Sequence, residues 1–395
     1  MKVVVTTKDF CEEAKHYLES EGFEVVLRNR LGIGAGAPDD VLYPVVEDAN
    51  AIIAGTETYR PELLTRLSNL KLISRNGIGY DAINLDALRK EGIGLTTTKG
   101  FVEGAVAEQV MAYILYFARR VDLQSADMHD HSWNSRLMPG AKNRTLGLVG
   151  FGGIGTEVAN AATHLGMDVY GYDPYISVNA AWRLSRNVKH ITNVDTIFQE
   201  CDYITVHVPL MESTKGMINK EKLDMMKDGV VVLNFARDTL VNDDDMAEAL
   251  ASGKVARYVS DFPNPKAANM DRVILTPHLG ASTKESEDNC AVMAVKELTD
   301  YLENGNIRNS VNFPACDMGV CQAESRIAVL HMNIPNMIGQ ITGILAAQGV
   351  NITDMTNKSR DKYAYTLLDL EHKPEAATIE KLKAIEGVLR VRKVK

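Results

Sequence analysis

This chain of 395 residues has few cysteines, no long apolar run and no excess of basic residues. No uninterrupted apolar stretch reaches the about 18 residues that span a membrane, so we expect no transmembrane helix. The five cysteines are odd in number and lack the spacing of zinc ligands, which predicts reduced thiols and no metal site. Lysine and arginine total 43 against 52 acidic residues, and the net charge of -9 disfavours binding to nucleic acid or to an anionic membrane.

The first residues enter an apolar strand directly and lack the features of a signal peptide, so we expect a cytoplasmic protein. The composition, with 45% hydrophobic and 24% charged residues, is typical of a folded globular chain. Because the length exceeds what one hydrophobic core usually organises, we expect two or three domains.

The first hundred residues alternate short β-branched runs with helical patterns. Strands are predicted at residues 3–6, 51–55 and 70–74 and a helix at residues 11–21, an alternation typical of a parallel sheet with crossover helices. A long helix is predicted at residues 105–127, where apolar residues are spaced for one buried face.

The alternation restarts at residue 145. Strands are predicted at residues 146–149, 168–171, 203–208, 230–235, 257–261 and 273–276. This pattern predicts a doubly wound nucleotide-binding domain of the Rossmann type. Beyond residue 314, about seventy residues follow the order β-α-β-β-α-β, which predicts a small two-layer domain of the ferredoxin-like type.

A glycine-rich loop, Gly150-Phe151-Gly152-Gly153-Ile154-Gly155, joins a predicted strand to a predicted helix. Its glycines permit a tight turn, the approach of a pyrophosphate to the backbone, and close helix packing, while the helix N-terminus attracts phosphate. Asp173, at the end of the next strand, can accept hydrogen bonds from the adenosine ribose hydroxyls and would repel a 2'-phosphate. The sequence therefore predicts an NAD site.

Two later strand ends carry the candidate catalytic residues Arg237 and His278. In a doubly wound fold the carboxyl ends of the strands line the ligand crevice. The planar guanidinium of arginine suits a bidentate carboxylate, and the near-neutral pKa of histidine suits removal of a hydroxyl proton. These residues predict oxidation of a 2-hydroxy acid, and His207, at another strand end, is expected to line the cofactor crevice.

Five ordered segments resemble the D-isomer-specific 2-hydroxyacid dehydrogenases. They are Arg75-Asn76-Gly77-Ile78-Gly79-Tyr80-Asp81, the loop from Gly150 to Gly155, Tyr172-Asp173-Pro174, Asn234-Phe235-Ala236-Arg237, and Pro277-His278-Leu279-Gly280-Ala281-Ser282-Thr283. The resemblance implies an NAD-binding domain at residues 99–286, inserted in a flavodoxin-like α/β substrate-binding domain formed by residues 1–98 and 287–315. It also implies catalysis in the cleft between them, with Arg237 on the substrate carboxylate and His278 as acid and base.

The resemblance further implies that Asp261 contacts the nicotinamide carboxamide. The other cofactor residues expected beyond the glycine loop and Asp173 are Ile78, His207, Val208, Pro209, Phe235, Ala236, Gly280 and Ala281. The substrate residues expected are Arg75, Asn76, Gly77 and Lys99.

Residues 324–395 resemble an ACT domain, a small module that binds amino acids. By that resemblance His331, Asn333 and Asn351 would bind L-serine across a pair of modules. A dehydrogenase fused to this module resembles one branch of the family. The resemblance implies oxidation of 3-phospho-D-glycerate to 3-phosphohydroxypyruvate with NAD, the first step of L-serine biosynthesis. We expect a small anionic substrate and a homodimer or homotetramer; the alternative is that the module only assembles subunits.

Two departures from the family pattern stand out. The family places a glutamate a few residues past the strand that bears Asp261, hydrogen-bonded to the catalytic histidine, and here it is missing or moved, which leaves Asn264 or Asp261 to orient His278. The loop at residues 54–57 lacks an arginine that phosphoglycerate enzymes often carry, so a phosphate would depend on Arg75 and Lys99. These departures leave open a reductase of another 2-keto acid, such as hydroxypyruvate or glyoxylate, or a non-enzymatic NAD-sensing interaction protein.

Overall fold

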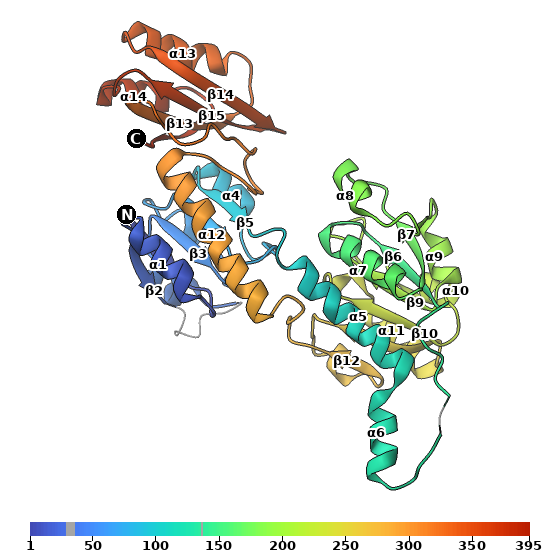
Figure 1. Ribbon diagram of the computed structural model, residues 1–395. Helices are drawn as coiled ribbons and strands as arrows, with labels where there is room; N and C mark the ends of the chain where they lie inside the picture. Colours follow the sequence, from blue (N-terminus) through green and yellow to red (C-terminus); the bar gives the residue numbers. More distant parts are fainter. Residues whose placement is uncertain (29–35, 136) are drawn as a thin grey trace. The chain divides into compact units, whose positions relative to one another are not determined.

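The computed structural model describes residues 1–28, 36–135 and 137–395. They form two compact units, of which unit 1 contains residues 1–99 and 284–395 and unit 2 contains residues 100–283 (Figure 1). Unit 1 has a parallel sheet and an antiparallel sheet, and unit 2 has one parallel sheet. The predicted fold class is confirmed. Within the described residues, no helix combines the length and the apolar character that crossing a membrane requires.

The parallel sheet of unit 1 has the strand order β2-β1-β3-β4-β5. Its strands are β1 (Lys2–Val5), β2 (Glu24–Leu27), β3 (Ala51–Ala54), β4 (Leu72–Arg75) and β5 (Gly94–Thr97). Its helices are α1 (Glu12–Ser20), α2 (Asp39–Val46), α3 (Pro61–Leu64), α4 (Leu85–Lys90) and α12 (Lys284–Asn304). Both faces are buried because the strand side chains alternate: Val3 and Val5 join a core with α1 and α12, whereas Val4 joins a core with α2, α3 and α4.

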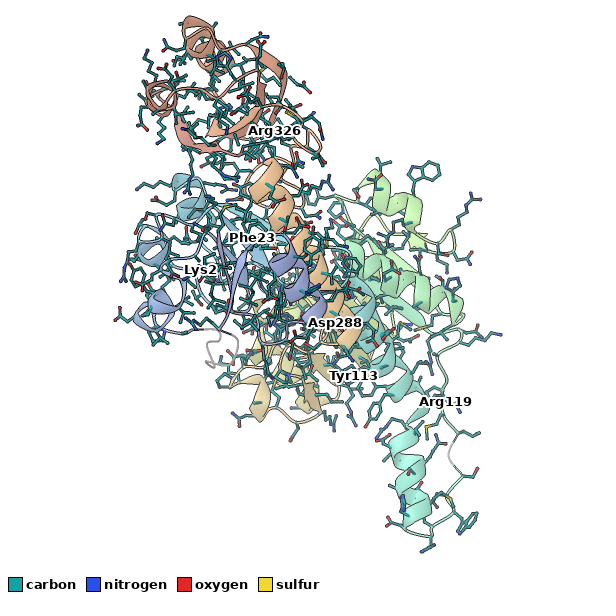
Figure 2. The ribbon with its side chains drawn as sticks, turned by 60° about the vertical axis from the view of Figure 1, so that its left-hand side comes forward. Lys2, Phe23, Tyr113, Arg119, Asp288 and Arg326 are labelled. Carbon is teal, nitrogen blue, oxygen red and sulfur yellow. The ribbon has the colours of Figure 1, made fainter. Side chains whose placement is uncertain are left out.

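The C-terminal module of unit 1 has an antiparallel sheet in the order β14-β15-β13-β16. Its elements are β13 (Ser325–Met332), α13 (Met337–Ala347), β14 (Ile352–Arg360), β15 (Tyr363–Leu370), α14 (Ala376–Lys383) and β16 (Val388–Lys393). One sheet face packs on α13 and α14, and the other, which includes Leu330 and Leu367, shares a core with α12. Figure 2 shows Arg326 where the module meets the end of α12.

The sheet of unit 2 is parallel and has the order β12-β11-β10-β9-β6-β7-β8. Its strands are β6 (Thr145–Val149), β7 (Asp168–Tyr172), β8 (Lys189–His190), β9 (Tyr203–Val206), β10 (Val230–Asn234), β11 (Val255–Ser260) and β12 (Val273–Leu275). Its helices are α5 (Glu103–Arg119), α6 (Val121–His129), α7 (Gly153–His164), α8 (Val178–Arg183), α9 (Val194–Glu200), α10 (Lys220–Met225) and α11 (Asp243–Ser252), with 3-10 turns η1 (Asp238–Leu240) and η2 (Ala267–Asn269). The strand order reverses between β6 and β9, and ligands of such sheets bind beyond the carboxyl ends of the strands at that point.

The prediction of one helix over residues 105–127 is wrong. The helix breaks at Arg120, whose backbone is left-handed with a φ of 44° and whose guanidinium pairs with Asp122 at 2.9 Å. The apolar spacing that predicted a buried face ends at this break, because α6 has no buried residue. Periodicity therefore located α5 and not the turn that ends it.

Candidate active site

The loop between β6 and α7 has the backbone that the glycine pattern predicts. Gly150 has a φ of 99°, and a Cβ there would lie 2.7 Å from the carbonyl oxygen of His207. A Cβ at Gly155 would overlap the carbonyl oxygen of Gly150. No described atom lies within 4 Å of a Cβ built at Gly152, and α7 begins at Gly153. A pyrophosphate fits this loop, because the backbone is bare at Gly152 and the first amides of α7 point beyond the helix end.

A buried carboxylate outside the sequence motifs, that of Glu103, lies against this loop. Glu103 is 7% exposed, and each of its carboxylate oxygens accepts a hydrogen bond from the backbone N–H of Gly100 at 2.9 Å. A Cβ at Gly153 would collide with the Glu103 side chain, which explains why glycine is needed there. Glu103 is the first residue of α5, and no signal in the sequence marked it.

Asp173 anchors the loop from the end of β7. One carboxylate oxygen accepts the backbone N–H of Phe151 at 2.8 Å, and the other accepts that of Tyr175 at 2.8 Å. Each ionised oxygen has a further lone pair, so the carboxylate can still accept hydrogen bonds from ribose hydroxyls. The chain thus offers both parts of an NAD site, a bare phosphate loop and a carboxylate held beside it.

His207 continues β9 at the same sheet edge, followed by Val208 and Pro209. Its Nε2 lies 3.0 Å from Thr205 Oγ1, and its Nδ1 is buried with no hydrogen-bond partner among the described residues. Burial lowers the pKa of His207 to about 3, so the ring is neutral at physiological pH. A histidine in that state can line a cofactor crevice and is a poor acid or base near neutrality.

Arg237 is presented by a loop that Asn234 organises. Asn234 is fully buried at the end of β10, where its Oδ1 accepts the N–H of Ala236 at 3.1 Å and its Nδ2 donates to the carbonyl of Arg237 at 2.7 Å. Phe235 and Ala236 are buried, so the loop is tied to the core. The guanidinium of Arg237 donates to the carbonyl of Ala236 at 2.6 Å.

His278 is presented by a loop that Asp261 organises. The Asp261 carboxylate is 2% exposed and accepts hydrogen bonds from Thr276 Oγ1 at 2.6 Å, Leu279 N at 2.8 Å and Gly280 N at 2.7 Å. His278 itself is left-handed with a φ of 58°, a conformation that costs a non-glycine residue roughly 1–2 kcal/mol. The Asp261 hydrogen bonds offset that cost. Ala281, which follows this loop, packs against the core of unit 2.

The side chain of Asn264, one of the two groups suggested to orient His278, makes hydrogen bonds to other residues. Asn264 Nδ2 donates to Asp243 Oδ2 at 3.0 Å, and its Oδ1 accepts the N–H of Ala267 at 2.7 Å, because the residue caps the short turn η2. The ring that lies against His278 is Phe262, with 4.6 Å between centroids and 47° between ring planes. No signal in the sequence marked Phe262.

The expected substrate residues of unit 1 follow the carboxyl ends of its parallel strands. Asn76 is 7% exposed, and its Nδ2 lies 3.2 Å from Glu287 Oε2 and 3.4 Å from Thr7 Oγ1. Gly77, with a φ of 129°, donates its N–H to Thr98 Oγ1 at 2.7 Å. The guanidinium of Arg75 folds back onto the carbonyl of Asn76. Ile78 comes next in the same loop, and Lys99 is exposed at the end of the unit's first segment.

A second carboxylate without a signal in the sequence is Glu57, in the loop where an arginine is missing. It is 1% exposed, and neither carboxylate oxygen has a hydrogen-bond partner among the described residues. Burial raises the pKa of Glu57, while the charge of Arg75 acts in the opposite direction. The loop at residues 54–57 therefore carries a hydrogen-bond acceptor, Glu57, whereas a bound phosphate would need a cation there.

The three residues expected to bind serine lie in different places in the C-terminal module. His331 is 2% exposed, with its ring nitrogens 2.8 Å from the carbonyl of Met332 and from Thr366 Oγ1, and burial lowers its pKa. Asn333 and Asn351 are exposed. Asn333 follows the β13 end that pairs with Tyr363, whereas Asn351 precedes the β14 end that pairs with Leu370. The two asparagines therefore lie at opposite ends of the sheet.

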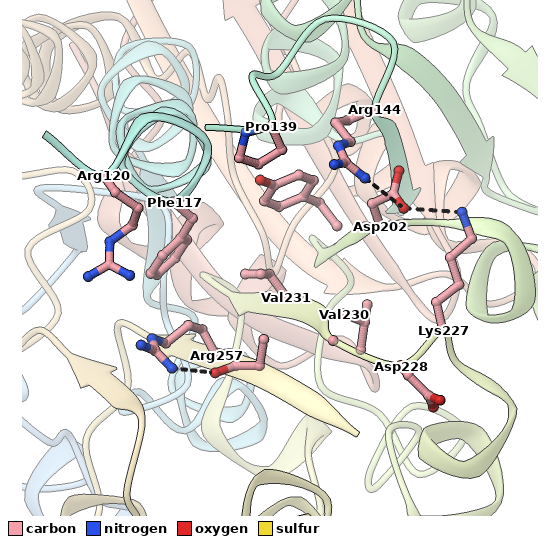
Figure 3. Close-up of a pocket in the computed structure, with 13 residues that line it drawn as sticks. Phe117, Arg120, Pro139, Arg144, Asp202, Lys227, Asp228, Val230, Val231 and Arg257 are labelled. Carbon is pink, nitrogen blue, oxygen red and sulfur yellow. Dashed lines mark hydrogen bonds and ion pairs between the residues drawn. The ribbon is translucent and has the colours of Figure 1, made fainter. Parts of the chain in front are cut away.

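A pocket of about 350 Å³ opens at the other edge of the sheet of unit 2 (Figure 3). It lies at the amino ends of β9, β10 and β11 and is lined by Phe117, Tyr203 and Val230 among others. Asp202 in its wall already pairs with Lys227 at 3.2 Å. The glycine loop, Arg237 and His278 follow the carboxyl ends, so this pocket is separate from them. No group of three or more metal-ligating side chains occurs in the part of the chain that the structure describes.

Comparison with known proteins gives consistent matches. Residues 111–280 match the family described as D-isomer specific 2-hydroxyacid dehydrogenase, NAD binding domain. The D-3-phosphoglycerate dehydrogenase of Escherichia coli (strain K12) is 30% identical over 398 residues, which cover 96% of this chain and 95% of that protein. The hydroxypyruvate reductase of Thermotoga maritima is 32% identical over 275 residues, 67% of this chain and 88% of that protein.

Comparison with solved structures also gives a match over most of this chain. The NAD+-bound 3-phosphoglycerate dehydrogenase of Entamoeba histolytica is 27% identical to this chain, with a TM-score of 0.66. The match covers 79% of this chain and 98% of that one.

Proposed function

Because this chain belongs to the D-isomer specific 2-hydroxyacid dehydrogenases and is an NAD-dependent enzyme, we propose that it oxidises 3-phospho-D-glycerate to 3-phosphohydroxypyruvate, the first step of L-serine synthesis. The observation that carries this proposal is the match to the Escherichia coli phosphoglycerate enzyme over 96% of the chain, a share that reaches into the C-terminal module.

The chemistry follows from the two organised loops. Arg237 binds the substrate carboxylate through its forked guanidinium, and the imidazole of His278 takes the proton of the C2 hydroxyl. When bound, NAD accepts the hydride that leaves C2. The neutral ring of His207 is too weak a base to compete for the proton near neutral pH, and His278 is assigned as the base.

The cofactor is held, in this proposal, by the glycine loop and by Asp173. The backbone at Gly152 and the start of α7 would hold the pyrophosphate, and Asp173 would accept hydrogen bonds from the ribose hydroxyls. The buried residues that border this edge, Phe235 and Ala236 after β10 and Gly280 in the His278 loop, form its apolar lining. The phosphate of the substrate is assigned to Arg75 and Lys99 of unit 1, the two cations among the expected substrate residues.

A second candidate function is reduction of an unphosphorylated 2-keto acid such as hydroxypyruvate. Glu57 favours it, because a buried carboxylate beside Arg75 offsets the charge that a phosphate would need. The similarity to the Thermotoga maritima hydroxypyruvate reductase also supports it.

An initial-rate screen separates the two functions. We expect kcat/KM for 3-phosphoglycerate with NAD to exceed that for D-glycerate by on the order of a hundredfold, the discrimination that a charged anchor provides. Equal specificity constants, or a preference for hydroxypyruvate with NADH, would contradict phosphoglycerate as the substrate. If 3-phosphoglycerate is the substrate, Arg75→Gln should raise KM for the phosphorylated acid far more than for the unphosphorylated one.

We also propose that the C-terminal module binds L-serine between two copies of the chain. A serine that touches both Asn333 and Asn351 needs two modules, since these residues lie at opposite ends of the sheet in one copy. The edge strand β14, nine residues long with mostly exposed side chains, supports pairing with a second copy. Because His331 is buried and already hydrogen-bonded, its part in this proposal is to hold the end of β13 rather than to touch the ligand.

Titration calorimetry with L-serine tests the regulatory proposal, with Asn333→Ala and Asn351→Ala as variants. We expect both variants to lose the binding heat while the mass in solution stays that of a homo-oligomer. Absence of heat with the unaltered chain would leave assembly as the role of the module. A monomer in solution would contradict both readings.

A further inference from the structure

The ring of Phe262 lies against both residues that carry the chemistry of unit 2. Its centroid is 4.6 Å from that of the His278 imidazole, and the guanidinium carbon of Arg237 lies 5.7 Å from the same centroid. We propose that Phe262 is a positioning residue for the oxidation step, one that orients the His278 imidazole relative to Arg237. The proposal rests on the dehydrogenase function given above and holds for either substrate considered there.

The position of the Phe262 ring is itself determined by its neighbours. The Ser260 hydroxyl, 1% exposed at the end of β11, accepts the N–H of Phe262 at 3.1 Å and donates to its carbonyl at 3.4 Å. The preceding residue, Asp261, is bound to the His278 loop through both carboxylate oxygens. The backbone at Phe262 is therefore fixed on both the strand side and the loop side.

The polar residues near Phe262 have other hydrogen-bonding roles. Asp261 accepts three hydrogen bonds from the loop of His278, so it shapes the backbone of that loop. Asn264 caps η2 and donates to Asp243. The ring of Phe262 contacts the imidazole itself.

An aromatic contact can restrict a catalytic histidine without adding charge. A tilted aromatic pair at this separation favours one ring orientation by about two- to tenfold. The guanidinium of Arg237 lies within the about 6 Å at which a cation is attracted to a ring face. When His278 takes the substrate proton, two cations face the same ring, and its negative face offsets part of their repulsion.

Three variants test this role, each measured with the substrate that the rate screen selects. Phe262→Leu removes the ring and keeps an apolar side chain, and Phe262→Tyr keeps the ring. Phe117→Leu is the matched control, because Phe117 also makes two aromatic contacts in unit 2, with Tyr113 and Tyr116, but lines the pocket at the opposite sheet edge.

We expect Phe262→Leu to lower kcat on the order of tenfold with KM for NAD unchanged, because only the geometry of proton transfer is disturbed. The primary isotope effect, measured with a 2-hydroxy acid deuterated at C2 or, for a 2-keto acid, with NADH deuterated at the transferred C4 position, should rise as chemistry becomes rate-limiting. Phe262→Tyr should restore kcat to within about threefold of the unaltered enzyme, and Phe117→Leu should leave kcat and the isotope effect unchanged.

A kcat within about twofold of the unaltered enzyme and an unchanged isotope effect in Phe262→Leu would overturn the proposal. So would an equal loss in Phe117→Leu, since a general loosening of unit 2 would then explain both. If Phe262→Leu fails to bind NAD or melts early, Phe262→Met, which keeps more of the volume, takes its place in the same comparison. Failure of the proposed function is distinct, because the unaltered enzyme would then turn over no 2-hydroxy or 2-keto acid in the screen.

Discussion

Single carboxylates determine local shape in this protein, and Asp261 is the clearest case. By family resemblance it is predicted to contact the nicotinamide carboxamide, and that contact stays a prediction. In the structure its two oxygens accept three hydrogen bonds from the loop that presents His278. Asp261 thus holds the left-handed backbone of His278, the candidate catalytic residue, in place.

Asp261→Asn tests this role. The amide keeps the size but replaces one accepting oxygen with a donor, so either Gly280 N–H or the pair Leu279 N–H and Thr276 loses its partner. We expect the variant to destabilise the His278 loop by about 1.5–3 kcal/mol and to reduce kcat on the order of tenfold or more. Asp243→Asn, at a partly buried aspartate elsewhere in unit 2, is the control. A raised KM for NAD with kcat unchanged would favour the carboxamide role instead.

Glu297 is a residue whose protonation couples to folding. It lies on α12, where its Oε1 accepts Asn309 Nδ2 at 2.5 Å, and burial raises its pKa from 4.5 to about 7. The folded state therefore keeps a proton that the unfolded chain releases between these pH values. Its stabilising contribution is present below about pH 4.5 and is lost as pH rises through about 7.

Glu297→Gln should flatten the dependence of folding stability on pH. The amide oxygen can still accept from Asn309 and carries no charge to bury, so the variant should be more stable than the unaltered chain by up to about 3 kcal/mol near pH 8 and similar to it near pH 5. Urea unfolding at both pH values measures the difference. Parallel curves for the two proteins would show that Glu297 is ionised in the folded state.

At the scale of elements, the glycine loop before α7 combines a structural requirement with a functional one. Gly155 is needed by the fold itself, because a Cβ would overlap the carbonyl oxygen of Gly150. Gly152 has an ordinary φ of -69° and open space where a Cβ would lie. The fold therefore does not require glycine at position 152. We infer that a bound ligand requires it.

Gly152→Ala and Gly155→Ala should therefore separate the two roles. Gly152→Ala should leave the melting temperature unchanged and weaken NAD binding on the order of tenfold or more, because the methyl group occupies the place of the pyrophosphate. Gly155→Ala should cost about 1–3 kcal/mol of stability through overpacking. Thermal melting and NAD titration measure both, and normal NAD affinity in Gly152→Ala would remove the pyrophosphate from that position.

For the whole molecule, the C-terminal module is part of unit 1 and shares its core. Leu330, Tyr365 and Leu367 pack in the same cluster as α12 residues, and Tyr365 Oη donates to the carbonyl of Gly305 at 2.8 Å. Arg326, 1% exposed, joins Asp369 at 2.5 Å and donates to the carbonyl of Asn304 at the end of α12 at 2.9 Å. A ligand of the module therefore acts on a sheet that is packed against the long helix of the unit.

Arg326→Ala should destabilise unit 1 by about 3–5 kcal/mol, because it leaves Asp369 buried without its partner and the end of α12 without its cation. Arg308→Ala is the control: Arg308 also pairs with an aspartate but is 59% exposed, so its loss should cost at most about 1 kcal/mol. Chemical unfolding of both variants measures the difference. Equal losses would show that the module is only loosely attached.

The sequence by itself determined the sheets, the predicted NAD site and the two catalytic candidates. These follow from local periodicity and from the positions of glycines and strand ends along the chain. Gly150, Asp173, Arg237 and His278 follow the strands that predicted them. Only the tertiary structure decided the roles of Phe262, Glu57 and Glu103, since each depends on which distant residue lies beside it. The break at Arg120 and the shared core of the C-terminal module are of the same kind. Periodicity marks a buried face, and only packing shows what covers it.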